Sequence, residues 1–138
     1  MPNPKDYPYW PRLVELLKAT GERVLQIGLE GEALLTIDYY YNLKISKIKE
    51  LIEGADLWIS VDSFLPHLAH HIPKRGIVLW GPSDPRIFGY PENENLWKGE
   101  KYLRKDNFGY WENCTANPEA FYKPEEVMIV VGAFLVEV

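Results

Sequence analysis

Short apolar runs alternate with amphipathic stretches along the chain, most clearly in its middle part. Leu57 to Val61 is rich in β-branched and aromatic residues, which predicts a buried strand. Apolar residues then recur at helical spacing until Pro73, at Leu65, Leu68, Ala69 and Ile72. Ile77 to Trp80 is a second apolar run. A strand, a helix and a strand joined by short loops predict a parallel βαβ crossover.

The N-terminal half continues this alternation. We expect a helix from Trp10 to Gly21, a strand over 23–29 and a second helix from Ile45 to Gly54, each supported by apolar spacing and by a terminal glycine or proline. Residues 33–38 fit either a short strand or an ordered connection, and Tyr39-Tyr40-Tyr41 is compatible with both.

Beyond Pro85 the pattern is looser. It predicts loops over 87–95, a short strand over 100–105 and a turn over 118–122. Pro124 and the acidic residues after it suit the first turn of a helix, but residues 127–138 are rich in β-formers, so propensity alone does not separate a helix from a strand there.

Composition narrows the class of protein. A chain of 138 residues with 46% hydrophobic and 25% charged residues is predicted to form one soluble domain, spanning residues 1–138. The single cysteine, Cys114, excludes an internal disulfide. A net charge of −5 argues against a nucleic-acid partner. We see no signal peptide and no apolar run long enough for a transmembrane segment, so we expect a cytoplasmic protein.

Chemically active side chains gather where the two central strands end. Asp62-Ser63 follows the first strand, with His67 in the next helical turn, and Gly81 to Pro85 follows the second. Ligands of parallel sheets bind outside the carboxyl ends of the strands. A carboxylate there can accept hydroxyl hydrogen bonds, and the start of a helix near Ser63 would favour a negatively charged group. The competing interpretation is a helix cap beside a histidine with a purely structural role.

Three histidines, His67, His70 and His71, lie at helical spacing and suggest a zinc-dependent hydrolase as an alternative. No carboxylate or cysteine is spaced along the sequence to complete the ligand set. We therefore expect neither a metal site nor a cofactor.

Several motifs together resemble a known family. They are Trp10-Pro11 opening a helix, Gln26-Ile27-Gly28 followed by Glu32, Gly54-Ala55-Asp56-Leu57, Val61-Asp62-Ser63-Phe64-Leu65-Pro66-His67-Leu68-Ala69 and Leu79-Trp80-Gly81-Pro82-Ser83-Asp84-Pro85. In order and spacing this set resembles the C-terminal half of glycosyltransferase family 9, the heptosyltransferases. The resemblance covers roughly residues 9–90 and continues more weakly to the segment from Pro124, which it implies is a helix.

The resemblance implies half of a GT-B fold: an α/β, Rossmann-like three-layer domain with a small, mainly parallel sheet that binds a nucleotide-diphosphate sugar. Carried over by position, Glu32 matches a residue that contacts the ribose, Leu43 one that packs on the base, and Asp62 one that contacts sugar hydroxyls. The rest of the implied donor site consists of Ser63, Phe64, His67, Gly81 and Ser83.

Two departures from the family pattern stand out. Phe64 replaces a glycine, and a buried or interface ring is the leading interpretation for it. The family's N-terminal domain, the first strand of this domain with its phosphate loop, and any residue matching the catalytic base lie outside the resemblance. We therefore expect sugar transfer to need that N-terminal domain, a partner chain or a second copy. The alternative is a non-catalytic binding or assembly module in which Phe64 blocks the sugar pocket.

Overall fold

The computed structural model describes residues 3–28, 32–36, 38–105 and 114–136. The chain divides into two compact units. The first unit comprises Met1–Pro8 and Asp56–Tyr122, and the second comprises Tyr9–Ala55 and Lys123–Val138. Residue 29, the last residue of the strand expected over 23–29, lies outside the described residues, and the single domain expected over 1–138 stays a prediction.

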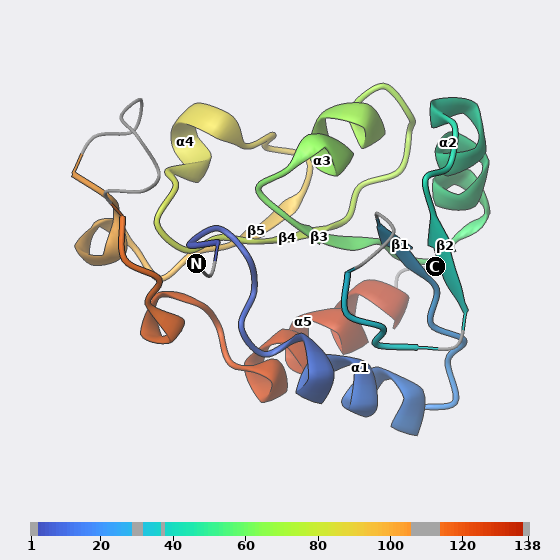
Figure 1. The fold of residues 1–138 in the computed structure, drawn as a ribbon, viewed down its shortest axis with the longest axis horizontal. Coiled ribbons are helices and arrows are strands. Elements are labelled where there is room, and N and C mark those ends of the chain that lie inside the picture. The colour runs from blue at the N-terminus through green and yellow to red at the C-terminus, as the bar shows by residue number, and fades with distance from the viewer. Residues whose placement is uncertain (1–2, 29–31, 37, 106–113, 137–138) are drawn as a thin grey trace. The chain divides into compact units, whose positions relative to one another are not determined.

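The first unit is built on a parallel sheet. Its described strands are β3 (Ile59–Val61), β4 (Ile77–Leu79) and β5 (Glu94–Leu96), which pair in the order β3-β4-β5. Helices α3 (Phe64–Ala69) and α4 (Pro85–Phe88) connect successive strands and lie on the same face of the sheet (Figure 1). The predicted parallel βαβ crossover is therefore confirmed, with Ile59 in register with Ile77.

Complete burial explains why the sequence predicts the middle strand, β4, so clearly. All residues of β4 are buried, as is Trp80 directly after it. The two tryptophans beside the strands keep a hydrogen bond while buried, since Trp58 Nε1 donates to the Lys74 carbonyl at 2.9 Å and Trp80 Nε1 to Asn95 Oδ1 at 2.8 Å. Trp80 is therefore part of the buried core of this unit.

The N-terminal segment belongs to this first unit. Tyr7 is 2% exposed, its ring meets Phe121 edge to face at 5.8 Å, and its hydroxyl donates to the Tyr122 carbonyl at 2.7 Å. Two short 3-10 helices complete the described part, η1 (Glu100–Tyr102) and η3 (Pro118–Ala120).

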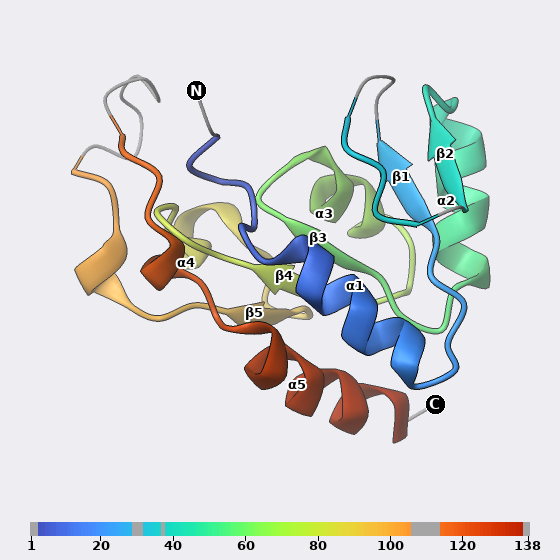
Figure 2. The same ribbon diagram turned by 60° about the horizontal axis from the view of Figure 1, so that its bottom comes forward.

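The second unit contains α1 (Trp10–Ala19), β1 (Gln26–Gly28), β2 (Tyr39–Tyr41), α2 (Ile45–Gly54) and α5 (Pro124–Val136). Strands β1 and β2 pair in parallel, and α1 and α5 lie side by side (Figure 2). Gly21 follows α1 with a φ of 89°, which is the left-handed conformation expected of a glycine after a helix. The α/β class with parallel pairing and the helix from Pro124 are both confirmed.

Two predictions for the C-terminal half of the first unit are wrong. The stretch expected to be loop over 87–95 contains the end of α4 and the start of β5. The strand expected over 100–105 contains a 3-10 turn instead. The sequence pattern does not predict β5 because this strand has no apolar run. Glu94 and Asn95 precede its one buried residue, Leu96.

Among the described residues, no helix is long and apolar enough to cross a membrane.

Candidate functional site

Asp62 follows β3 directly, at the edge of the sheet where the parallel strands end. Its side chain is 15% exposed, and its Oδ2 lies 3.8 Å from Nζ of Lys5, which comes from the N-terminal segment of the same unit. A carboxylate and an ammonium group therefore share this strand end. Together they can accept hydroxyl hydrogen bonds and attract an anion.

Ser63 occupies the N-cap position of α3, but its side chain makes no capping hydrogen bond. Its hydroxyl instead donates to the Val61 carbonyl at 3.2 Å and lies 3.1 Å from the Ser60 hydroxyl. The competing interpretation, a helix cap, is therefore not supported by the side chain of Ser63, which bonds back toward the end of the strand.

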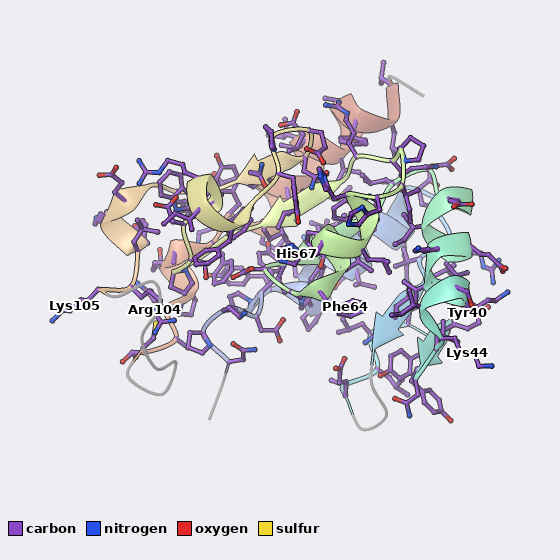
Figure 3. The ribbon with its side chains drawn as sticks, turned by 90° about the horizontal axis from the view of Figure 1, so that it is seen from above. Tyr40, Lys44, Phe64, His67, Arg104 and Lys105 are labelled. Atoms are coloured by element: carbon purple, nitrogen blue, oxygen red, sulfur yellow. The ribbon has the colours of Figure 1, made fainter. Side chains whose placement is uncertain are left out.

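Phe64 begins α3 with its side chain turned to solvent. It is 58% exposed, so the prediction of a buried ring is wrong (Figure 3). A partner interface for this ring stays a prediction. An exposed aromatic side chain thus stands where the family pattern has glycine, next in sequence to Asp62-Ser63.

His67 lies one turn further along α3 and is exposed. Its Nδ1 is 2.7 Å from the hydroxyl of Tyr90, a residue of the connection between α4 and β5. His70, the C-cap residue of α3, stacks on the Tyr90 ring and pairs with Glu92. The hydrogen bond from His70 lowers the pKa of the Glu92 carboxyl below its ordinary value.

The loop after β4 carries the remaining predicted residues of this unit. Gly81 is buried, and a Cβ atom there would overlap the ring of Phe121. Ser83 is 2% exposed, and its hydroxyl has no hydrogen-bond partner within the described part of the chain. A buried hydroxyl of this kind is a site for water or for a ligand atom.

A buried carboxylate holds the far end of this loop. Asp84, 4% exposed, accepts hydrogen bonds from the backbone N–H and the side chain of Arg86, which lowers the pKa of its carboxyl. Arg86 also reaches Glu100 at 2.8 Å, and its guanidinium lies 5.0 Å from the centre of the Trp97 ring. This network fixes the loop rather than offering groups to a ligand.

Glu32 and Leu43 lie in the second unit. Glu32 is exposed, and its carboxylate lies over Gly28, where an added Cβ would meet it. The pKa of Tyr39 is raised, first by desolvation and then by the negative charge of Glu32. Leu43 is half-buried in the connection between β2 and α2.

The structure therefore brings six predicted residues to one sheet edge in the first unit: Asp62, Ser63, Phe64, His67, Gly81 and Ser83. Sequence reasoning missed Lys5 and Tyr90. Lys5 lies in a proline-rich lead-in and Tyr90 in a stretch predicted as loop, so neither carried a local signal. Their proximity to Asp62 and His67 arises only from the fold.

The three histidines His67, His70 and His71, of which only His67 lies within α3, were also candidates for a metal site. Within the ranges that the structure describes, no group of three or more His, Cys, Asp or Glu side chains is placed to hold a metal ion. His67 and His70 are instead engaged by Tyr90 and Glu92.

Comparison with known proteins matches the middle of the chain to a family. Residues 41–106, just under half of the chain, match glycosyltransferase family 9 (heptosyltransferase). Over this stretch the chain is similar to glycosyltransferase family 9. The matched stretch holds β3, α3, β4 and the loop after it, and so includes every predicted donor residue of the first unit. It also includes Leu43, whereas Glu32 lies outside it.

Curated relatives agree with this match. The family 9-like chain is 28% identical to lipopolysaccharide heptosyltransferase 1 of Salmonella typhimurium over 96 residues, which is 62% of this chain and 30% of that protein. It is 24% identical to the protein of the same name in Escherichia coli K12 over 104 residues, 67% of this chain and 33% of the relative. The chain thus spans about a third of the length of these relatives. No solved structure matches it significantly.

Proposed function

We propose that the chain binds a nucleotide-diphosphate sugar at the carboxyl ends of β3 and β4, as the donor-binding part of a GT-B glycosyltransferase. The observation that carries the proposal is the position of Asp62. It is a partly exposed carboxylate at a parallel strand end, within the region that matches glycosyltransferase family 9. The names of the relatives, lipopolysaccharide heptosyltransferase 1, support glycosyl transfer as the reaction class.

The side chains of the first unit suit the parts of such a donor. Asp62 is an acceptor for sugar hydroxyls, since an ionised carboxylate offers several lone pairs. Lys5 and His67 are donors for diphosphate oxygens. The leaving group of the reaction is a nucleoside diphosphate, so positive charge and N–H groups at this point would stabilise the charge that develops on it. The proposed mechanism therefore requires no metal cofactor.

Glu32 and Leu43 keep the roles implied by the family resemblance, namely contacts with the ribose and the base of the donor. The exposed carboxylate of Glu32 and the half-buried side chain of Leu43 are compatible with these roles. The two roles are inferred only from the positions of Glu32 and Leu43 in the family pattern.

Transfer itself is proposed to need a further protein part that holds the acceptor and the catalytic base. The chain spans about a third of its relatives' length, and the family 9 match ends at residue 106. That part is either an N-terminal domain or a second chain. The purified 138-residue chain is expected to bind the donor without transferring its sugar.

A second candidate is a binding or assembly module without catalysis. The exposed ring of Phe64 favours this second candidate. An aromatic side chain that is 58% exposed can pack against a partner protein as well as against a sugar. The two candidates differ in whether nucleotide sugars bind.

An NMR titration separates them. Backbone amide resonances of the 138-residue chain would be followed while a panel of nucleotide-diphosphate sugars is added. Donor binding predicts saturable shifts for residues 62–67 and 81–83, with small shifts across α5. The absence of shifts at millimolar ligand would overturn the donor proposal and leave the module as the better account.

A further inference from the structure

Tyr90 contacts two histidines, His67 within α3 and His70 at the C-cap of the same helix. Its hydroxyl is 2.7 Å from Nδ1 of His67, whose ring meets the tyrosine edge to face at 5.4 Å. On its face, Tyr90 stacks with His70 at a centroid distance of 4.0 Å and an interplanar angle of 17°. Tyr90, in the connection before β5, thus contacts both α3 and the residue that caps its C-terminal end.

The stacking partner is itself held in place. His70 Nδ1 pairs with a carboxylate oxygen of Glu92, which comes from the same connection as Tyr90. His67 of α3 and the C-cap residue His70 therefore engage two side chains of the 90–92 segment. This arrangement fixes the tyrosine ring and so fixes the point at which its hydroxyl meets His67.

Chemistry sets the direction of the hydrogen bond between Tyr90 and His67. A neutral imidazole has one nitrogen that donates and one that accepts, and the phenol O–H is a donor. The unprotonated ring nitrogen is a better acceptor than the phenol oxygen. The favoured arrangement therefore has Tyr90 donating to Nδ1, which leaves the proton of His67 on Nε2.

We propose that Tyr90 is a positioning residue, which holds His67 in the tautomer that presents Nε2–H as a hydrogen-bond donor at the candidate site. His67 is exposed and lies one turn after the Asp62-Ser63 strand end, so this N–H is open to a ligand. The identity of the ligand, a phosphate or sugar oxygen of a nucleotide-diphosphate sugar, depends on the proposed function. The assignment of the His67 tautomer does not depend on it.

The first test needs no ligand. Long-range proton–nitrogen spectra of the histidine rings, recorded on the full chain at alkaline pH, report which nitrogen carries the proton. The expected result is an Nε2-protonated His67, with an Nδ1 shift that changes in Tyr90→Phe and is unchanged in the control Tyr102→Phe. A proton on Nδ1 in the wild type, or the same Nδ1 shift in Tyr90→Phe, would overturn the proposal.

The second test uses a nucleotide-diphosphate sugar that binds the wild type. Tyr90→Phe keeps the stacked ring and removes one hydrogen bond, so it is expected to weaken binding about fivefold. His67→Ala is expected to weaken binding at least as much, and adding Tyr90→Phe to it should change nothing further. Independent, additive losses would show that Tyr90 does not act through His67. If no nucleotide sugar binds, the proposed function fails, while the ring spectra still decide the role of Tyr90.

Discussion

Arg86 holds the buried carboxylate of Asp84 through two nitrogens, with Nη2 2.8 Å from Oδ2 and Nε 3.0 Å from Oδ1. The same carboxylate accepts the backbone N–H of Arg86 at 2.8 Å and so caps α4. Because Arg86 continues to Glu100, this one pair ties the loop after β4 to the segment beyond β5. The network thus holds in place the loop that carries Gly81 and Ser83.

Asp84→Asn is expected to lower the free energy of unfolding by about 2 kcal/mol, since hydrogen bonds to a charged partner are lost while an amide can still cap the helix. Chemical denaturation measures this. Asp56→Asn, which neutralises an aspartate outside the network, is the matched control. Equal stabilities for Asp84→Asn and the control would contradict the proposed strength of the pair.

The Asp84 pair also predicts a pH dependence. Hydrogen bonds from Arg86 lower the pKa of the Asp84 carboxyl from its ordinary value of 3.8. A carboxyl with a lowered pKa in the folded state contributes stability above the unfolded pKa and loses it as the pH falls through the folded pKa. The stability gap between wild type and Asp84→Asn should therefore be constant above about pH 5 and shrink below about pH 4. Urea denaturation over a pH series measures the gap, and a gap that widens on acidification would contradict the assignment.

Gly81→Ala tests the packing of the loop. A Cβ at Gly81 would overlap the Phe121 ring, whereas a Cβ at Gly54 would meet nothing within 4 Å. We expect Gly81→Ala to cost about 1 to 3 kcal/mol of unfolding free energy. Gly54→Ala should be neutral. Thermal or urea unfolding of both variants checks this, and a fully stable Gly81→Ala would show that Phe121 moves aside freely.

Phe64→Ala tests what the exposed ring does. Since Phe64 is 58% exposed, its removal should change stability by less than about 0.5 kcal/mol. We expect weaker binding of a nucleotide-diphosphate sugar, with binding of the nucleoside diphosphate alone unchanged, because the ring would contact the sugar. Titration of both ligands measures this, with exposed Ile87→Ala as the control. Tighter sugar binding by Phe64→Ala would mean instead that the ring obstructs the site.

The sequence predicted β3, α3 and β4 because each carries its own signal. The strands are two apolar runs, and the helix is an apolar stripe at helical spacing bounded by Ser63 and Pro73. It did not predict β5, an edge strand of the described sheet whose first two residues are polar. Exposed edge strands need no apolar alternation, so local pattern cannot find them.

Some residues of the candidate site could likewise be predicted from the sequence, and others could not. Asp62 could be identified because it follows a predicted strand directly, and His67 because it lies in the helical turn that comes next. Lys5 and Tyr90 could not, because their contacts with Asp62 and His67 join segments distant in the sequence. The exposure of Phe64 was also beyond prediction, since an apolar ring at the start of a helix favours burial by composition alone.

The most direct test of donor binding is calorimetric titration of the 138-residue chain with a panel of nucleoside diphosphates and nucleotide-diphosphate sugars. Asp62→Asn and Glu32→Gln serve as the site variants, and Asp56→Asn as the control. Our account predicts saturable binding of at least one nucleotide sugar, weakened about tenfold or more by Asp62→Asn, on the scale of a charged hydrogen bond, and unaffected by the control. Absence of binding at millimolar ligand, or binding that Asp62→Asn leaves unchanged, would contradict a donor site at the end of β3.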